Sequence, residues 1–257
     1  MCPDPATDAP GNSGRFHTTR WSLILRSLDG GGDEQRAHEA LAQLCRIYWR
    51  PIFAFICRRG HAVSDAQDLT QDFFVAMLKG NLLEQADRER GRFRSLLLKS
   101  LQNFLSDAQS RARARKRGGD VQFVSWDDWM AEAPSRLTIP AEAMESWPAE
   151  RLFDVRWAAT VAERALRQLQ EECEKRGRRR VFDSLSAMLV AERGEVSYEE
   201  LARSLNVGTG EIKRLLHQLR RRYRALLRAE VADTVARKED IEDELRHLVG
   251  ALAVSGS

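Results

Sequence analysis

Cysteines are few in this sequence, and long apolar runs are absent. The four cysteines, Cys2, Cys45, Cys57 and Cys173, lie far apart and form no CxxC pair, which favours free thiols over a metal site. No apolar run approaches the roughly 18–20 residues that cross a bilayer, and residues 1–20 lack the apolar segment of a secretory signal. We therefore expect a cytoplasmic protein with no metal, no other cofactor and no membrane partner.

Signatures of catalytic chemistry are missing as well. The sequence has no phosphate-cradling glycine loop and no HExxH motif, and its five histidines show neither metal-ligand nor triad spacing. An enzyme is therefore not expected.

Charge is nearly balanced in total but unevenly distributed. The formal net charge is +3, yet basic residues cluster at 111–117, 175–180 and 220–224, and acidic residues cluster at 120–150 and after 238. Clusters of opposite sign predict two kinds of surface, one for a polyanion and one for a basic partner.

The apolar positions follow the helical period in two blocks, and no segment shows sustained strand alternation. In the first block we expect helices over 21–28 and 41–56, from Ser64 as an N-cap to 80–81, and over 92–117. Pro51 should kink or interrupt the second of these. In the second block we expect helices near 150–174, 179–192, 197–205, 209–230 and 239–252. The sequence therefore predicts an all-α fold.

The segment between the two blocks differs in composition. Residues 119–149 hold three tryptophans, three prolines and an excess of acidic residues, without a sustained period. We predict two helical domains, 18–118 and 150–257, joined by this acidic linker and preceded by a disordered segment at 1–17. The last helix is expected to pack on the second domain.

Residues 197–228 carry the most informative pattern of the second block. Ser197 with Glu200 three residues later predicts a capping box, and "NVG" at 206–208 allows a tight turn into a basic amphipathic helix. The outward positions of that helix are Thr209, Lys213, Arg214, His217, Arg220 and Arg221. A short helix, a turn and a basic helix form the helix-turn-helix arrangement that enters the major groove of DNA. The alternative is an ordinary helical hairpin whose charges are solvated.

Three stretches follow one another in a fixed order: "SDAQDLTQDFFVAML" at 64–78, "GRFRSLLLKSLQNFLSDAQSRARARKR" at 91–117, and 197–228. They resemble regions 2.1–2.2, regions 2.3–2.4 and region 4 of the sigma-70 family of RNA polymerase sigma factors, in its ECF (extracytoplasmic-function) group. The resemblance implies a transcription initiation factor that binds core RNA polymerase at the β′ clamp helices and the β flap. It also implies recognition of the −10 and −35 promoter elements and melting of the DNA. An anti-sigma factor or another regulator is a further candidate partner.

The resemblance assigns polymerase binding to the helix at 64–78. Asp65, Asp68 and Asp72 fall at i, i+3 and i+7 on one face, with Gln71 beside them. Carboxylates in this pattern suit charge pairing with arginines of the clamp helices. The alternative is a helix whose early acidic residues only favour its dipole.

Recognition of the −10 element falls, by the same resemblance, on the helix that follows. Capture of unstacked bases requires ring surface, polar groups that read a flipped base, and cations for the backbone. The residues assigned are Phe93, Arg94, Lys99, Gln102, Asn103, Ser106, Asp107, Arg111, Arg113 and Arg115. A purely structural role is the alternative for each of them.

Recognition of the −35 element falls on the outward positions between Thr209 and Arg221, although Gly208 replaces the usual serine cap. The acidic linker would thread the polymerase cleft, or else act as a solvated tether.

A competing interpretation of the whole chain is a stand-alone helix-turn-helix regulator that binds its operator without polymerase. That interpretation does not account for the acidic helix followed by a basic helix in the first block.

Overall fold

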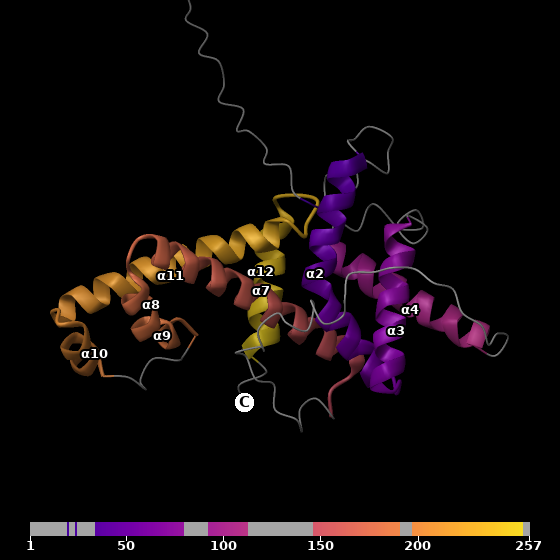
Figure 1. The fold of residues 1–257 in the computed structure, drawn as a ribbon, viewed down its shortest axis with the longest axis horizontal. Helices are drawn as coiled ribbons and strands as arrows, with labels where there is room; N and C mark the ends of the chain where they lie inside the picture. The colour runs from indigo at the N-terminus through magenta and orange to yellow at the C-terminus, as the bar shows by residue number, and fades with distance from the viewer. Residues whose placement is uncertain are drawn as a thin grey trace, which may run out of the picture.

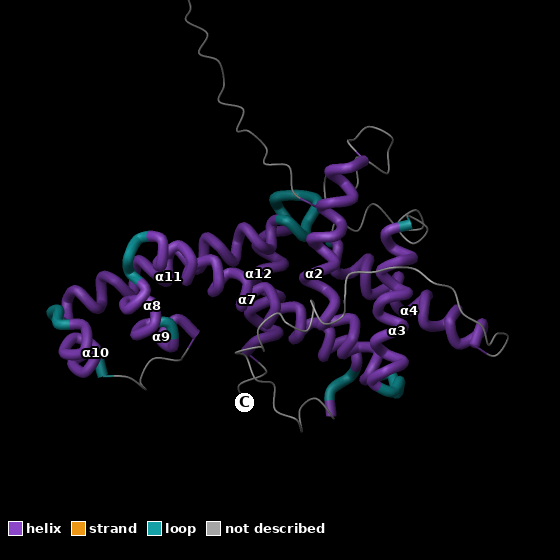
Figure 2. The backbone as a smooth tube through the Cα atoms, in the orientation of Figure 1, coloured by secondary structure: helices purple, strands orange, loops and turns teal. Residues whose placement is uncertain are grey.

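The computed structural model describes residues 20, 24, 34–79, 92–112, 146–190 and 197–253. Within these ranges the regular structure is helical, apart from an isolated bridge between Arg92 and Val235, and Figure 2 shows the helices and the turns that join them. The helices are α2 (Glu34–Arg58), α3 (Val63–Leu78), α4 (Phe93–Ala112), α7 (Ala149–Lys175), α8 (Arg179–Leu185), α9 (Ala187–Val190), α10 (Tyr198–Leu205), α11 (Thr209–Ala232) and α12 (Asp240–Ala253). The predicted all-α fold is confirmed.

Most predicted helices lie within a few residues of their positions in the structure, with one difference in the second block. The single helix predicted at 179–192 is split into α8 and α9 at Ser186. The predicted segment at 1–17 and the linker up to residue 145 lie outside the described residues. The stripe at 21–28 also lies outside them, apart from Ile24, which is buried in the core.

α2 continues as one helix through Pro51, so a break at this position, one of the two predicted effects, is absent. A proline inside a helix costs about 3 kcal/mol or more, because it removes a backbone hydrogen bond and its ring crowds the preceding turn. The neighbouring Tyr48, Ile52 and Phe55 have no exposed surface. Full burial of large apolar side chains contributes roughly 1.5–3 kcal/mol each, which offsets the cost of the proline.

α3 begins at Val63 instead of using Ser64 as its N-cap. The N-cap residue is Ala62, in an extended conformation with φ −62° and ψ 157°, and it makes no side-chain cap bond. The first turn is closed by the backbone, because the N–H of Ala66 donates to the carbonyl of Ala62 at 2.8 Å. Ala66 is fully buried, so packing and not a side-chain cap fixes the start of this helix.

α7 connects the two predicted domains. Its first half, with Phe153 and Trp157, belongs to an apolar core built with α2, α3, α4 and α12. Its second half, with Ala165 and Leu169, belongs to another core built with α8, α10 and α11. Figure 1 shows α7 and α11 running between the bundle of α2, α3 and α4 and the end of the molecule that holds α8, α9 and α10. Helices from both predicted domains therefore contribute to one shared core.

α12 packs on α7 and α11, as expected for a tail helix of the second domain. Its buried apolar side chains Ile241 and Leu248 also join the core that contains α2, α3 and α4. α12, the last helix of the described residues, therefore lies against the N-terminal bundle as well.

Candidate polymerase and promoter interfaces

α3 separates a buried apolar side from an acidic surface. Phe73 is fully buried, whereas Asp65, Asp68 and Asp72 are exposed and Gln71 is half-buried. Partial burial, and then the charge of Asp68, raise the pKa of Asp72 above its ordinary value. None of the three carboxylates forms an ion pair with any residue in the described ranges. The helix thus presents uncompensated negative charge, which suits a cationic partner.

α4 presents a polar face to solvent. Lys99, Asn103, Ser106 and Asp107 are all exposed, and their spacing places them on one side of the helix. The opposite side is buried through residues such as Leu101. This exposed face combines a cation, an amide, a hydroxyl and a carboxylate, which are groups that read base edges and hold a phosphate.

The start of α4 is buried. Phe93 has no exposed surface, and Arg94 is 7% exposed. The Arg94 guanidinium donates from Nε to Glu244 Oε1 at 2.9 Å and from Nη1 to Asp154 Oδ1 at 2.6 Å. Gln102 is half-buried, and its amide donates to Glu150 at 3.2 Å. Arg94 and Gln102 are therefore engaged by α7 and α12, and the Phe93 ring packs against that of Tyr48 in α2 at a centroid distance of 5.2 Å. In this arrangement Phe93 and Arg94 are not exposed at the surface, where the resemblance would have them contact DNA.

The C-terminal end of α4 carries the remaining cations assigned to the −10 element. Arg111 lies in the helix, but its side chain is outside the described part of the structure. Arg113 and Arg115 lie outside the described residues altogether.

The turn between α10 and α11 is set by the backbone. Asn206 ends α10 in the left-handed region, with φ 54° and ψ 47°, and Gly208 is the N-cap of α11. Asparagine enters this region more readily than most residues, because its short polar side chain bonds locally. The predicted capping box at the start of α10 is absent. Ser197 is the N-cap residue but makes no cap bond, because its hydroxyl donates to the Glu199 carboxylate at 2.8 Å instead.

α11 turns most of its predicted DNA-facing residues to solvent. Its core side buries Ile212, Leu216 and Leu219. The exposed positions are Thr209, Lys213, Arg214, His217 and Arg221. Two of these make local contacts, since Arg214 pairs with Glu211 and the Lys213 ammonium lies 5.7 Å from the ring centroid of Tyr198. The helix therefore offers an exposed cationic ridge.

Arg220 differs from the other predicted −35 residues. It is half-buried, and its guanidinium donates to the backbone carbonyl of Met188 at 2.9 Å. It therefore anchors α11 to α9, which the helical period alone could not indicate.

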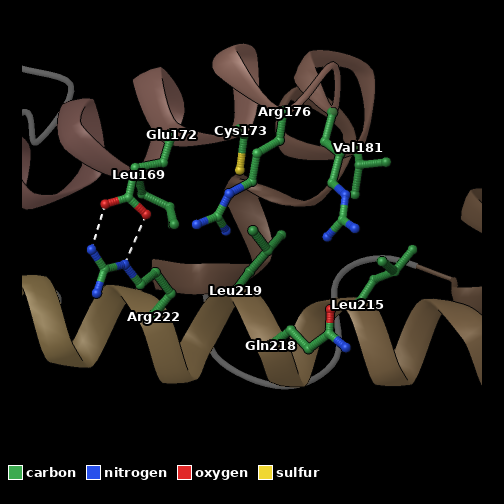
Figure 3. Close-up of a pocket in the computed structure, with 10 residues that line it drawn as sticks. Leu169, Glu172, Cys173, Arg176, Val181, Leu215, Gln218, Leu219 and Arg222 are labelled. Atoms are coloured by element: carbon green, nitrogen blue, oxygen red, sulfur yellow. Dashed lines mark hydrogen bonds and ion pairs between the residues drawn. The ribbon is translucent and has the colours of Figure 1, made fainter.

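A small cavity of about 80 Å³ lies where the end of α7, the start of α8 and α11 meet. Figure 3 shows Arg222 of α11 paired with Glu172 of α7 at its edge, where Arg222 Nε donates to Glu172 Oε2 at 2.8 Å. The hydrogen bond between them lowers the pKa of Glu172 and raises the pKa of Arg222. This pair ties the side of α11 that lies away from the cationic ridge to α7.

Residues 24–229 match the family described as ECF sigma factor. The chain belongs to the ECF sigma factor family. It is thus a sigma factor that acts in transcription initiation, with RNA polymerase and promoter DNA as the partners that this role implies. No curated protein and no solved structure matches the chain.

The sequence patterns did not indicate the buried charged residues that join the helices of this sigma factor. Glu244 and Glu230 are 0% and 3% exposed, and the Glu230 carboxylate accepts bonds from Arg164 and Gln168 at 2.9 and 2.6 Å. A signal was present for Glu244, because it falls within the apolar stripe of α12 between Ile241 and Leu248. A charge at such a position indicates a buried partner.

Neither a membrane span nor a metal cluster occurs in the described parts of this sigma factor. No described helix combines the length and the apolar character needed to cross a bilayer. The described His, Cys, Asp and Glu side chains form no group of three or more that would hold a metal ion.

Proposed function

We propose that this sigma factor binds core RNA polymerase through the acidic face of α3 and reads promoter DNA with two further helices. The exposed face of α4 engages the −10 element and captures bases from the melted strand, and α11 reads the −35 element. The acidic face of α3 is suited to the β′ clamp helices, because complementary charge orients and accelerates docking.

The observation that carries the proposal is the cationic ridge of α11. Lys213, Arg214 and Arg221 are exposed on a helix that follows a short helix and a tight turn. A helix in this setting enters the major groove with its first turns at base edges, while its arginines neutralise phosphates. The exposed His217 and Thr209 add groups that can bond to base edges.

Run-off transcription with purified core polymerase on a promoter library tests the proposal. We expect transcripts only when this chain is added to core enzyme. In gel shifts, duplex promoter should be bound weakly by the chain alone and tightly by the chain with core. Tight binding of a duplex by the chain alone, with no transcript from any promoter, would identify a stand-alone regulator and overturn the proposal.

The docking surface is tested by charge reversal at Asp68, which is exposed and forms no ion pair within the described residues. We expect Asp68→Arg to weaken binding to core polymerase by about 2–5 kcal/mol, as for charge pairs across interfaces. Because Asp68 buries little surface, the free energy of unfolding should change by less than about 0.5 kcal/mol. Co-purification with core measures the effect, and Glu171→Arg on exposed α7 surface is the matched control. Equal co-purification of the two variants would contradict the assignment.

A further inference from the structure

Buried charges form the contact between α4 and α12. Arg94 of α4 and Glu244 of α12 are 7% and 0% exposed, and their Nε–Oε1 distance is 2.9 Å. Asp154 of α7 accepts a second bond from Arg94 at 2.6 Å, and the ring of Trp157 lies 5.3 Å from the guanidinium carbon. Two carboxylates and an aromatic ring thus surround a residue of the helix proposed to bind −10 DNA.

The contact extends to the residue before α4. Arg92 Nη2 lies 3.5 Å from Asp243 Oδ2, and Arg92 Nη1 lies 3.5 Å from Glu244 Oε2. The backbone joins the two segments as well, because the N–H of Phe93 donates to the carbonyl of Thr234 at 3.0 Å. The start of α4 is therefore held by the segment that follows α11 and by the first turns of α12.

The chemistry of this contact matches that of a phosphate contact. Four of the first five residues of α12 are acidic: Asp240, Glu242, Asp243 and Glu244. Arginine presents its donors in a planar fork that fits carboxylate and phosphate oxygens alike. The carboxylates of Asp243 and Glu244 therefore satisfy Arg92 and Arg94 with the same kind of bond that DNA phosphates would make.

The composition of the contact indicates that it can be released. A buried ion pair is a weak source of stability, because desolvation of both charges cancels much of their attraction, and apolar residues serve a permanent contact as well or better. α12 buries only two apolar side chains, Ile241 and Leu248, with Glu244 between them, while Leu245, Ala251 and Leu252 are partly buried. A surface of this kind stays soluble when it is exposed, as a reversible contact requires.

We propose that α12 is an internal mimic of the DNA backbone. In the described structure, the carboxylates of α12 pair with Arg92 and Arg94. When −10 DNA binds, its phosphates replace these carboxylates and α12 separates from α4. α7 stays on α2 during this change, since Phe153 and Trp157 remain in the shared core. The inference rests on the proposed function, because it takes α4 as the −10-binding helix.

The test measures binding of fluorescent single-stranded DNA of random sequence to the full-length chain by anisotropy, because phosphate contacts do not depend on sequence. Glu244→Gln removes the central carboxylate while keeping its shape. Glu239→Gln is the matched control, since Glu239 is exposed, precedes α12 and forms no ion pair within the described residues. Both variants change the net charge equally.

We expect Glu244→Gln to bind the DNA roughly tenfold more tightly than Glu239→Gln, and Arg94→Ala in the Glu244→Gln background to remove this gain. Equal affinity of the two single variants would overturn the inference. If Glu244→Gln does not fold, Asp243→Asn replaces it, because Asp243 is exposed and pairs with Arg92. A smaller gain for Asp243→Asn then supports the mimic, and no gain refutes it.

Run-off transcription separates this inference from the proposed function. If Glu244→Gln binds DNA more tightly but neither it nor the natural chain starts transcripts with core enzyme, the proposed function fails, and only the masking of a DNA-binding surface by α12 stands. If transcription starts normally and the DNA affinity is unchanged, α12 is a structural helix only and the mimic is refuted.

Discussion

Asn206 holds the turn of the helix-turn-helix in the left-handed region, with φ 54° and ψ 47°. Its side chain is exposed, so a substitution tests the backbone without disturbing the core. Alanine in this region places its Cβ too near the next carbonyl oxygen, at a cost of about 1–2 kcal/mol. Glycine has no Cβ and enters the region freely. We therefore expect Asn206→Ala to lower the free energy of unfolding by about 1 kcal/mol relative to Asn206→Gly.

Urea unfolding of both variants measures this difference. Two hydrogen bonds depend on the turn, from Asn206 N–H to the Arg203 carbonyl at 3.2 Å and from Val207 N–H to the Ala202 carbonyl at 3.0 Å. If the turn is distorted in Asn206→Ala, its affinity for −35 DNA should fall, whereas Asn206→Gly should bind as the natural chain does. Equal stability of the alanine and glycine variants would show that the left-handed conformation is not required.

Two further predictions concern contacts between α7 and α11. Glu230→Ala leaves Arg164 without its buried partner, so we expect a loss of about 3 kcal/mol in urea unfolding. Adding Arg164→Ala should recover part of that loss, and strictly additive effects would show that the pair is not coupled. Burial raises the pKa of Tyr223 from 10.0 to about 12, while its hydroxyl donates to the Ala162 carbonyl at 3.1 Å. The unfolded chain then loses this proton near pH 10 and the folded chain keeps it, so stability should fall as the pH rises from about 10 to about 12. The matched variant Tyr223→Phe should lack this part of the pH dependence, and an unchanged slope would contradict the assignment.

The helices of this sigma factor could be predicted from the period of apolar residues, because burial of one face depends on local spacing. The same period placed Lys213, His217 and Arg221 at the surface, where the structure has them. Caps were predicted less well. Ser64 has the preferred side chain for an N-cap, yet α3 begins one residue earlier, with Ala62 as its N-cap. Ser197 is the N-cap residue of α10, but its hydroxyl bonds to the Glu199 carboxylate and makes no cap bond.

Contacts between distant parts of the chain could not be predicted from spacing. Arg94 bonds to Glu244, 150 positions further along the chain, and Arg220 bonds to a backbone carbonyl of α9. A cationic side chain has the same local pattern whether its partner is DNA or an internal carboxylate. Only the packing of α7, α11 and α12 on the N-terminal bundle decides between these two partners, and this packing depends on the whole fold.

The continuity of α7 has a consequence for the promoters that this chain can use. Its 27 residues extend for about 40 Å at a rise of 1.5 Å per residue, and its two halves are embedded in different cores. Under the proposed function, α7 fixes the distance and orientation between the two DNA-reading helices, α4 and α11. One extra base pair in the spacer turns the −35 site by roughly 35° around the duplex axis. A continuous helix cannot adjust the relative orientation of the two DNA-reading helices to that rotation. This chain should therefore accept a narrow range of spacer lengths.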